Sequence, residues 1–330
     1  SPDGIHWTKL DVPGIPSSDE SNFSYNPKDG LFIHTGKRGG PHGRSVALAT
    51  SRDFETWTDY GVVFHADDLD QELGRENIKT RLADATLEPM RYNDPGRYNV
   101  DVYNMGVFRY EGLYIGTPAL FHATGPHPNY PNTDGFHLVQ LVCTRNLKNW
   151  RRLGDRQMFI GPSRRDSGAY DLTQIIGPSN AVSRGDELWF YYTGIKYRAA
   201  GSDYVGNYPA GKWIRRPGFD TDGGAICLAV LRRDGFISLD ATDAEGIVQT
   251  RPFASPGSKL FVNVDAPKGN LRLEVLDGEG NVVARSEPLS GDLLREPVTW
   301  TDGDIADFKD QAVSLRFTLR NGQFYSYWME

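Results

Sequence analysis

The sequence predicts an all-β protein, a β-propeller followed by a small antiparallel β-sandwich. Three observations predict it. A short turn that ends in a large aromatic residue recurs along the chain, and strand–turn–strand units recur beside it. After Arg251 the pattern changes to short strands of alternating hydrophobicity. Repetition of one all-β unit, with an aromatic residue in each copy, is typical of propeller blades.

The recurring turn opens with a hydroxyl-bearing residue and closes with tryptophan at residues 1–7, 51–57 and 144–150. A shortened fourth copy at 233–236 closes with phenylalanine. A polar side chain at the third position can bond back to the backbone, and the aromatic ring can pack between neighbouring sheets. Each turn adjoins a run that reads as a strand, so we expect it to follow the third strand of a blade.

Three further segments read as blade openings, in which an inner strand, a tight turn with glycine and a bulky second strand follow one another. They cover residues 21–35, 102–116 and 173–193. Propellers typically need four or more blades. We therefore expect a portion of the propeller to precede Ser1, and the alternative is one blade too divergent to recognise. Helical periodicity is convincing nowhere, and residues 67–87, in a long insertion, are the only candidate for a helix.

The C-terminal part of the chain has a different pattern. Strands at 259–264, 271–276, 282–285, 298–300 and 312–319 alternate with turns at 277–280, 291–292 and 321–322. This pattern predicts a small antiparallel sandwich. We therefore expect two domains, a catalytic propeller at 1–250 and a sandwich at 251–330. We interpret the sandwich as a structural appendage, with a sugar-binding module as the alternative.

Charge and length exclude several partners. The chain has 36 Lys and Arg against 43 Asp and Glu, a formal net charge of −7, which disfavours nucleic acid because phosphate binding needs a basic face. No apolar run approaches the ~20 residues of a membrane span. The histidines are not at ligand spacing, so we expect neither a metal nor a cofactor. The sequence leaves the oligomeric state open.

An aspartate stands immediately before each predicted inner strand: Asp19, Asp101 and Asp171. Equivalent positions in a propeller surround one axis, so we expect the three carboxylates to converge in one axial pocket. When carboxylates are crowded together, the pKa of one is raised and another stays ionised. The first can then act as a general acid and the second as a base. The alternative is that each aspartate caps a strand-entry turn for ordinary backbone reasons.

Other polar residues lie on the same predicted strands and could bind the hydroxyl groups of a ligand. Arg44 joins them from an outer strand. The candidate substrate-binding residues are Asn22, Tyr103, Asn104, Gln174, Asn180 and Arg44.

Together, the Trp-closed turns, the three aspartates and the C-terminal sandwich resemble the five-bladed propeller glycosidases of glycoside hydrolase families 32, 43 and 68 and their bacterial relatives. The segments 101–116 and 235–241 carry most of the resemblance. It implies five blades and a glycosidase that cleaves a terminal sugar from an oligosaccharide or polysaccharide with axial carboxylates. It implies a secreted or periplasmic location as well.

The resemblance also implies roles for the aspartates. Asp19 matches the base or nucleophile of the first blade, and Asp101 matches the residue that orients substrate and tunes pKa values. Asp171 falls nearest the acid, which is a glutamate in those families. The family 32 signature Trp-Met-Asn-Asp-Pro is missing, and Asn93-Asp94-Pro95 reads as a turn.

Two other functions stay open at this point. One is a non-catalytic carbohydrate-binding propeller, in which the aspartates only hold hydroxyl groups or cap turns. The other is a glycoside phosphorylase, which needs a phosphate site built from basic residues. The candidates for that site are Arg44, Arg164 and Arg165.

Overall fold

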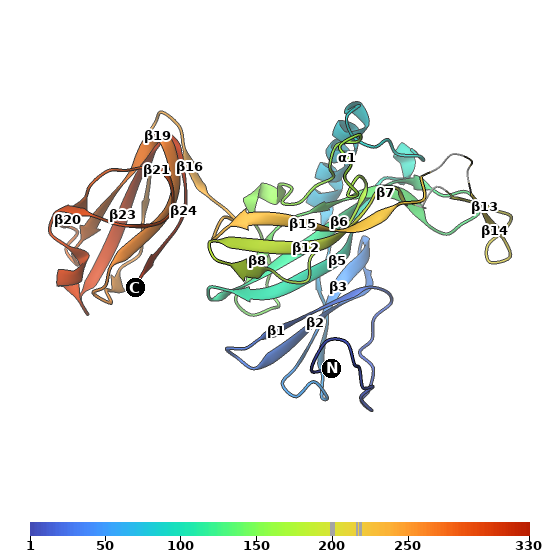
Figure 1. Cartoon of the computed structure of the whole chain (residues 1–330), viewed down its shortest axis with the longest axis horizontal. Coiled ribbons are helices and arrows are strands. Elements are labelled where there is room, and N and C mark those ends of the chain that lie inside the picture. Colours follow the sequence, from blue (N-terminus) through green and yellow to red (C-terminus); the bar gives the residue numbers. More distant parts are fainter. Residues whose placement is uncertain (199–201, 216, 218–219) are drawn as a thin grey trace. The chain divides into compact units, whose positions relative to one another are not determined.

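The computed structural model describes residues 1–198, 202–215, 217 and 220–330 (Figure 1). The protein is all-β apart from one longer helix and a few short helical turns in this described part. The chain divides into two compact units. The first comprises Ser1–Val182 and Trp189–Ala229, and the second comprises Ser183–Leu188 and Val230–Glu330.

The first sheet of the N-terminal unit is antiparallel, with strand order β1-β2-β3-β4. Its strands are β1 (Ser21–Asn26), β2 (Leu31–Gly40), β3 (Gly43–Ser51) and β4 (Thr58–Phe64). The β1–β2 turn is closed by Gly30, whose φ of 57° lies in the left-handed region that glycine adopts without strain. The predicted opening at 21–35 is confirmed, and β2 continues five residues further than predicted.

The second sheet is built on a long hairpin of β5 (Asn99–Tyr110) and β6 (Leu113–Pro126). β6 is long enough to pair with β8 (Val142–Thr144) near its beginning and with β7 (Thr133–Val139) near its end. β9 (Arg151–Arg152) completes the sheet. The predicted opening at 102–116 is therefore confirmed as part of this longer hairpin.

The third sheet consists of β10 (Gln174–Ile176), β12 (Glu187–Ile195) and β11 (Val182–Arg184), with β15 (Gly224–Arg232) also paired to β12. The inner strand is shorter than the sequence predicts, because Gly177 and Pro178 leave the ladder after β10. Their backbone groups bond Asn104 and Thr117 of the second sheet instead. A separate hairpin consists of β13 (Ser202–Val205) and β14 (Lys212–Arg215).

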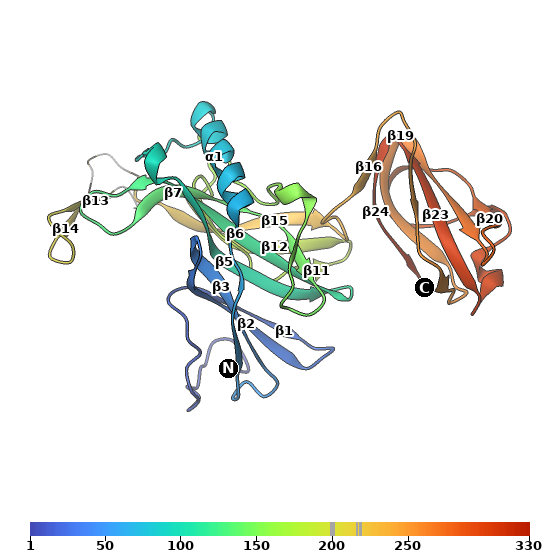
Figure 2. The same ribbon diagram turned by 180° about the vertical axis from the view of Figure 1, so that it is seen from behind.

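The first sheet contacts the second through β1 and β5, and the third sheet contacts the second through β10 and β7. Residues of β2, β3, β5 and β6 form a shared core that includes Ile33, Val46, Val102 and Leu120. Helix α1 (Asp68–Ala83) lies against β5 and β6 and confirms the predicted helical segment (Figure 2). Its capping box joins Asp67 and Asp70. Short 3₁₀ turns follow at η1 (Pro95–Arg97) and η2 (Gly154–Arg156).

The Trp-closed turns adopt the predicted bonding pattern. Asp53 Oδ1 accepts hydrogen bonds from the backbone N–H groups of Glu55 and Thr56, and Asn146 Oδ1 does the same for Lys148 and Asn149. Asp3 does so in the first copy. Trp150 packs edge-on against Phe64 of β4, 6.4 Å between ring centroids, and so joins the second sheet to the first.

The C-terminal unit is a single antiparallel network around the 17-residue strand β19 (Leu260–Leu276). The first half of β19 pairs with β24 (Gly322–Met329), and its second half pairs with β20 (Val282–Ser286) and β23 (Ala312–Arg320). The network is completed by three more strands and one 3₁₀ turn: β18 (Phe253–Ala254), β21 (Leu289–Pro297), β22 (Trp300–Asp302) and η4 (Ile305–Phe308). Its core includes Val262, Leu273, Leu315 and Phe317.

This unit begins earlier than the boundary predicted at residue 250. β16 (Leu239–Ala241) pairs with β24, and β17 (Gly246–Gln249) pairs with β23. Both strands therefore belong to the C-terminal network. The pattern of hydrophobic residues did not reveal this, because two strands of three and four residues are too short to show a period.

Candidate active site

The strongest cluster of charged groups lies where β1 begins. The ammonium group of Lys37, on β2, bonds Asp19 Oδ2 at 2.8 Å and also Glu20 Oε2. The Lys37 side chain is only 4% exposed, whereas that of Asp19 is 55% exposed. Partial burial works to raise the pKa of Asp19, but the hydrogen bond and charge of Lys37 outweigh it and lower the pKa. Asp19 is therefore an ionised carboxylate that solvent can reach.

Tyr103 of β5 forms the floor of this cluster. Its hydroxyl donates to Glu20 Oε1 at 2.9 Å, and Lys37 Nζ lies 3.7 Å from the centre of its ring. Burial and the bond to Glu20 raise the pKa of Tyr103 to about 12. The phenol therefore stays a neutral hydrogen-bond donor at physiological pH, and its ring stabilises the buried ammonium by a cation–π contact.

Asp101 lies two residues earlier on β5 and is 5% exposed. Its Oδ2 accepts from Arg44 Nε at 3.0 Å and from the Arg44 backbone N–H at 3.2 Å. Gly43, with φ +116°, lets the backbone approach this closely, because a Cβ there would lie 2.9 Å from Asp101 Oδ2. Burial raises the pKa of Asp101, although the charge of Arg44 opposes the shift. Among the described residues, Oδ1 of Asp101 has no hydrogen-bond partner.

A second layer of side chains lies behind Asp101 and Tyr103. The guanidinium groups of Arg44 and Arg198 lie 4.8 and 4.4 Å from the ring centre of Phe121, on β6. His137 of β7 is fully buried, 4.7 Å from the ring of Tyr103. Its Nδ1 accepts from the backbone of Ile175, and burial holds its pKa well below the ordinary value, so the imidazole is neutral.

The predicted binding residues divide into three groups. Arg44 and Tyr103 belong to the cluster, as described. Asn22 and Asn104 form an amide network instead: Asn22 donates to Ser179 Oγ at 2.6 Å, and Asn104 bonds Asn22 and Gly177. These amides tie the three inner segments together.

The remaining two predicted residues lie apart from the charged cluster. Gln174 is buried on β10. Asn180 is exposed beyond the end of β10, and its side chain bonds the backbone of Ala181.

Asp19 and Asp101 belong to one cluster, because their partners Lys37 and Arg44 lie 3.7 and 5.2 Å from the ring centre of Tyr103. Asp171 has other neighbours. It is 5% exposed, and its Oδ2 accepts a hydrogen bond of 2.6 Å from the hydroxyl of Tyr192. In the part of the chain that the structure describes, its carboxylate makes no contact with Lys37 or Arg44. The convergence of all three carboxylates therefore remains a prediction.

A cavity of about 190 Å³ adjoins the cluster, because Arg198 lines it. Glu88, from the segment after α1, also lines this cavity. Burial raises the pKa of Glu88, although Arg165 and Arg81 oppose the shift. Sequence reasoning did not select Glu88, because it precedes no strand and belongs to no repeat. The other residues that it missed are Glu20, Lys37, His137 and Arg198.

No group of three or more His, Cys, Asp or Glu side chains among the described residues is arranged to hold a metal ion. None of the helices described has both the length and the apolar character needed to cross a membrane.

The chain is similar to known proteins in its three-dimensional structure only. No protein-family model matches the chain. No curated protein matches it either. Solved structures similar to it are glycoside hydrolases. One described as a glycoside hydrolase is 14% identical over 65% of this chain and 46% of its own, with a TM-score of 0.33.

Two further structures cover more of the chain. An endo-arabinase from Bacteroides thetaiotaomicron is 13% identical over 86% of this chain and 81% of its own, with a TM-score of 0.30. A family 32 β-fructofuranosidase from Bombyx mori is 10% identical over 94% and 79%, with a TM-score of 0.28.

The chain spans about half the length of the first structures that it matches. At TM-scores below 0.5, neither fold nor activity transfers from these proteins to this one.

Proposed function

We propose that the protein is a glycoside hydrolase that cleaves a terminal sugar from an oligosaccharide or polysaccharide. The single observation that carries the proposal is that Lys37, which bonds Asp19, and Arg44, which bonds Asp101, both contact the ring of Tyr103. One carboxylate is ionised and open to solvent, and the other is buried with a raised pKa. Environments that separate the pKa values of neighbouring carboxylates suit glycoside hydrolysis.

We propose, further, that the three sheets of the N-terminal unit are blades of a five-bladed propeller. The contacts of β1 with β5 and of β10 with β7, and the turns that follow the outer strands, support this arrangement. A secreted or periplasmic location fits the proposed substrate, since polysaccharides do not cross a membrane.

Asp19 is proposed as the nucleophile or general base. Lys37 keeps it ionised, and its exposure lets it reach either the anomeric carbon or a water molecule. A separation of about 5 Å from the acid favours the retaining reaction, and about 6.5–9.5 Å favours inversion. Asp101 is proposed to orient the sugar through its unpartnered Oδ1 and to tune the charge of the cluster.

Glu88 is proposed as the general acid, in place of the Asp171 that the sequence suggested. A proton donor must reach the glycosidic oxygen, and Glu88 lines an open cavity beside Arg198. Its raised pKa keeps the carboxyl protonated to a higher pH. Asp171, by contrast, is buried and bonded by Tyr192. In the reaction the Glu88 proton passes to the departing sugar oxygen, and water supplies the hydroxyl on the cleaved sugar.

The test is hydrolysis of a panel of activated aryl glycosides and matching oligosaccharides, with and without phosphate. Asp19→Asn should lower both rates by about 10²–10⁴-fold, because the amide is neither base nor nucleophile. Glu88→Gln should spare the activated substrates and impair the oligosaccharides. It should also flatten the alkaline limb of the pH–rate profile, since activity falls as pH rises through the pKa of this acid. Asp59→Asn, on β4, is the matched control.

Asp171→Asn separates the two candidate acids. Loss of oligosaccharide hydrolysis in this variant, with Glu88→Gln active, would return the role to Asp171. Wild-type rates in Asp19→Asn would contradict hydrolysis at this cluster. Absence of hydrolysis in the wild-type protein, with binding of the saccharides retained, would favour a carbohydrate-binding propeller. A requirement for phosphate would indicate a phosphorylase instead.

A further inference from the structure

A second cavity of the N-terminal unit lies far from the charged cluster. Its volume is about 530 Å³, within the range of small-ligand sites. Tyr114 lines it near the beginning of β6, whereas Phe121, beside Asp101, lies seven residues further along the same strand. At ~3.3 Å per residue the two positions are roughly 23 Å apart. This cavity is therefore separate from the proposed active site.

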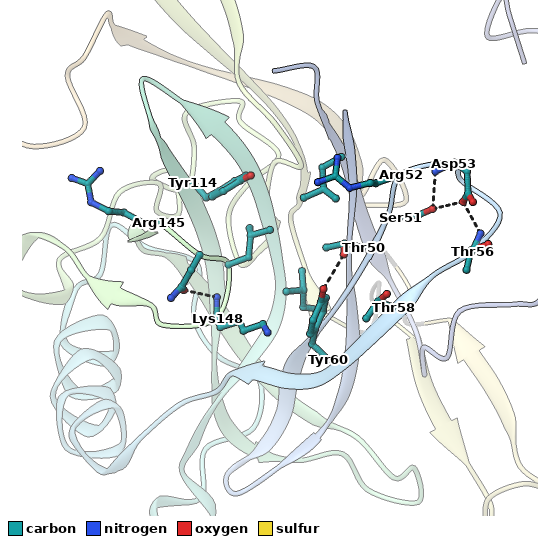
Figure 3. Close-up of a pocket in the computed structure, with 14 residues that line it drawn as sticks. Thr50, Ser51, Arg52, Asp53, Thr56, Thr58, Tyr60, Tyr114, Arg145 and Lys148 are labelled. Atoms are coloured by element: carbon teal, nitrogen blue, oxygen red, sulfur yellow. Dashed lines mark hydrogen bonds between the residues drawn. The ribbon is translucent and has the colours of Figure 1, made fainter. Parts of the chain in front are cut away.

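Two of the Trp-closed turns form its walls, one from each of the first two sheets. Figure 3 shows Arg145 and Lys148 on one side and Arg52 on the other, with Thr50 and Tyr60 between them. The floor is apolar, formed by Leu31, Leu48 and Leu147. The turns therefore present polar side chains from two sheets to a shared cavity.

The charge of this cavity is positive in a protein whose net charge is −7. Three cations line it, and in the described part of the chain no carboxylate lies within ion-pair distance of them. Arg52 donates to the backbone carbonyl of Asp29, and Lys148 Nζ lies 4.4 Å from the ring centre of Tyr60. The one lining carboxylate, Asp53, accepts bonds from its own turn. The cations are therefore available to an anionic ligand.

Hydroxyl groups lie between the two cationic walls. Thr50 bonds the hydroxyl of Tyr60 at 3.4 Å, and Thr58 follows on β4. A single inorganic ion would fill little of this volume of about 530 Å³. A chain of sugars with a carboxylate on successive units matches cations on opposite walls and hydroxyl groups between them.

We propose that this cavity binds a short acidic saccharide, an oligosaccharide of uronic acids, at a site distinct from the proposed active site. Arg145, Lys148 and Arg52 bind the carboxylates of the saccharide. This inference does not rest on the proposed hydrolase activity, because none of its residues belongs to the charged cluster around Lys37.

The test is calorimetric titration of the full chain with a uronic acid trisaccharide, a neutral trisaccharide of the same linkage and inorganic sulfate. Asp19→Asn serves as background, so that hydrolysis does not interfere. We expect binding of the uronic acid trisaccharide that weakens with added salt. Arg145→Gln and Lys148→Gln should each weaken it about tenfold. Arg151→Gln, an exposed arginine of β9 outside the cavity, should leave it unchanged.

Equal affinity for the neutral trisaccharide would overturn the role of the cations, and equal affinity for sulfate would overturn the saccharide. An equal loss in Arg151→Gln would show that binding follows overall charge. Absence of binding to the uronic acid trisaccharide would also overturn the site. Arg145→Gln should hydrolyse neutral aryl glycosides at the wild-type rate. Failure of hydrolysis in the wild type with intact saccharide binding would therefore count only against the proposed enzyme activity.

Discussion

Lys37 shows how one side chain sets the ionisation of a whole site. It is almost fully buried, yet it carries a charge that two carboxylates and one aromatic ring compensate. Burial of an ammonium group without such partners costs several kcal/mol. The arrangement therefore depends on Asp19 staying ionised, which links the geometry of the site to pH.

We predict that Lys37→Gln lowers the free energy of unfolding by about 2 kcal/mol at pH 7, because two neighbouring carboxylates lose their shared cation. The folded-state pKa of Asp19 lies below its ordinary 3.8, so its stabilising contribution is complete above that value and disappears as pH falls through the folded pKa. The difference between wild type and variant should therefore be full at pH 5–7 and shrink near pH 3. Chemical denaturation across this pH range measures it.

The control is Lys28→Gln. Lys28 is an exposed lysine in the β1–β2 turn of the same sheet, so its substitution should change the free energy of unfolding very little. A difference of unchanged size at pH 3, or an equal loss in Lys28→Gln, would contradict the proposed coupling.

At the scale of the element, the same turn motif has different roles in different places. Trp150 closes its turn between two sheets, where it contacts Phe64. Trp57 packs on Phe23 and His34 of its own sheet. Trp7 is 77% exposed although its turn has the same backbone bonds. The motif therefore specifies a turn, and its position in the fold decides whether the ring stabilises a contact between sheets.

We predict that Trp150→Ala lowers the free energy of unfolding by about 2–3 kcal/mol, less than for a fully buried aromatic, because Trp150 is only partly buried against the core. Trp150→Phe should cost far less, because it keeps a ring against Phe64 and removes an indole N–H that has no partner in the described part of the chain. Trp7→Ala is the matched comparison and should change stability by less than about 0.5 kcal/mol. Equal losses at Trp7 and Trp150 would refute this distinction.

The strands and turns that the sequence predicts correctly are those whose signal lies in neighbouring residues. β1 has the predicted bounds, and the aspartate and asparagine side chains of the turns bond as expected. The third inner strand was predicted too long, because Gly177 and Pro178 bond across to the second sheet, a tertiary contact that no local pattern contains.

The site was predictable only in part for a similar reason. Asp19 and Asp101 could be selected from their place before inner strands. Lys37 lies beyond the predicted end of its strand, and Arg198 and Glu88 come from irregular segments with no repeat or period. Their importance depends on which neighbours the fold gives them, and spacing along the chain carries no such information.

At the scale of the whole molecule, the two compact units have separate cores. The core of the C-terminal unit draws on β19, β23 and β24 and includes side chains from Leu260 to Phe324. Each unit therefore buries its own apolar surface, and we expect two unfolding transitions in calorimetry of the full chain.

The position of the boundary between these units gives the last prediction. A fragment of residues 230–330 retains β16 and β17, whereas a fragment of residues 251–330 lacks both. Without them, β24 loses three paired residues and β23 loses four. The side chains of Phe317 and Phe324, which lie beside β16 and β17, become more exposed to water. Because each lost hydrogen bond costs about 0.5–1.5 kcal/mol net, the shorter fragment should be less stable by about 3–5 kcal/mol.

Urea denaturation of the two fragments, followed by circular dichroism, measures this difference. The longer fragment should unfold cooperatively. Equal midpoints would place the boundary near residue 250, as the sequence pattern suggested, and would mean that β16 and β17 are peripheral to the C-terminal fold. Failure of the longer fragment to fold, with the full chain stable, would mean instead that the C-terminal core needs residues before Val230.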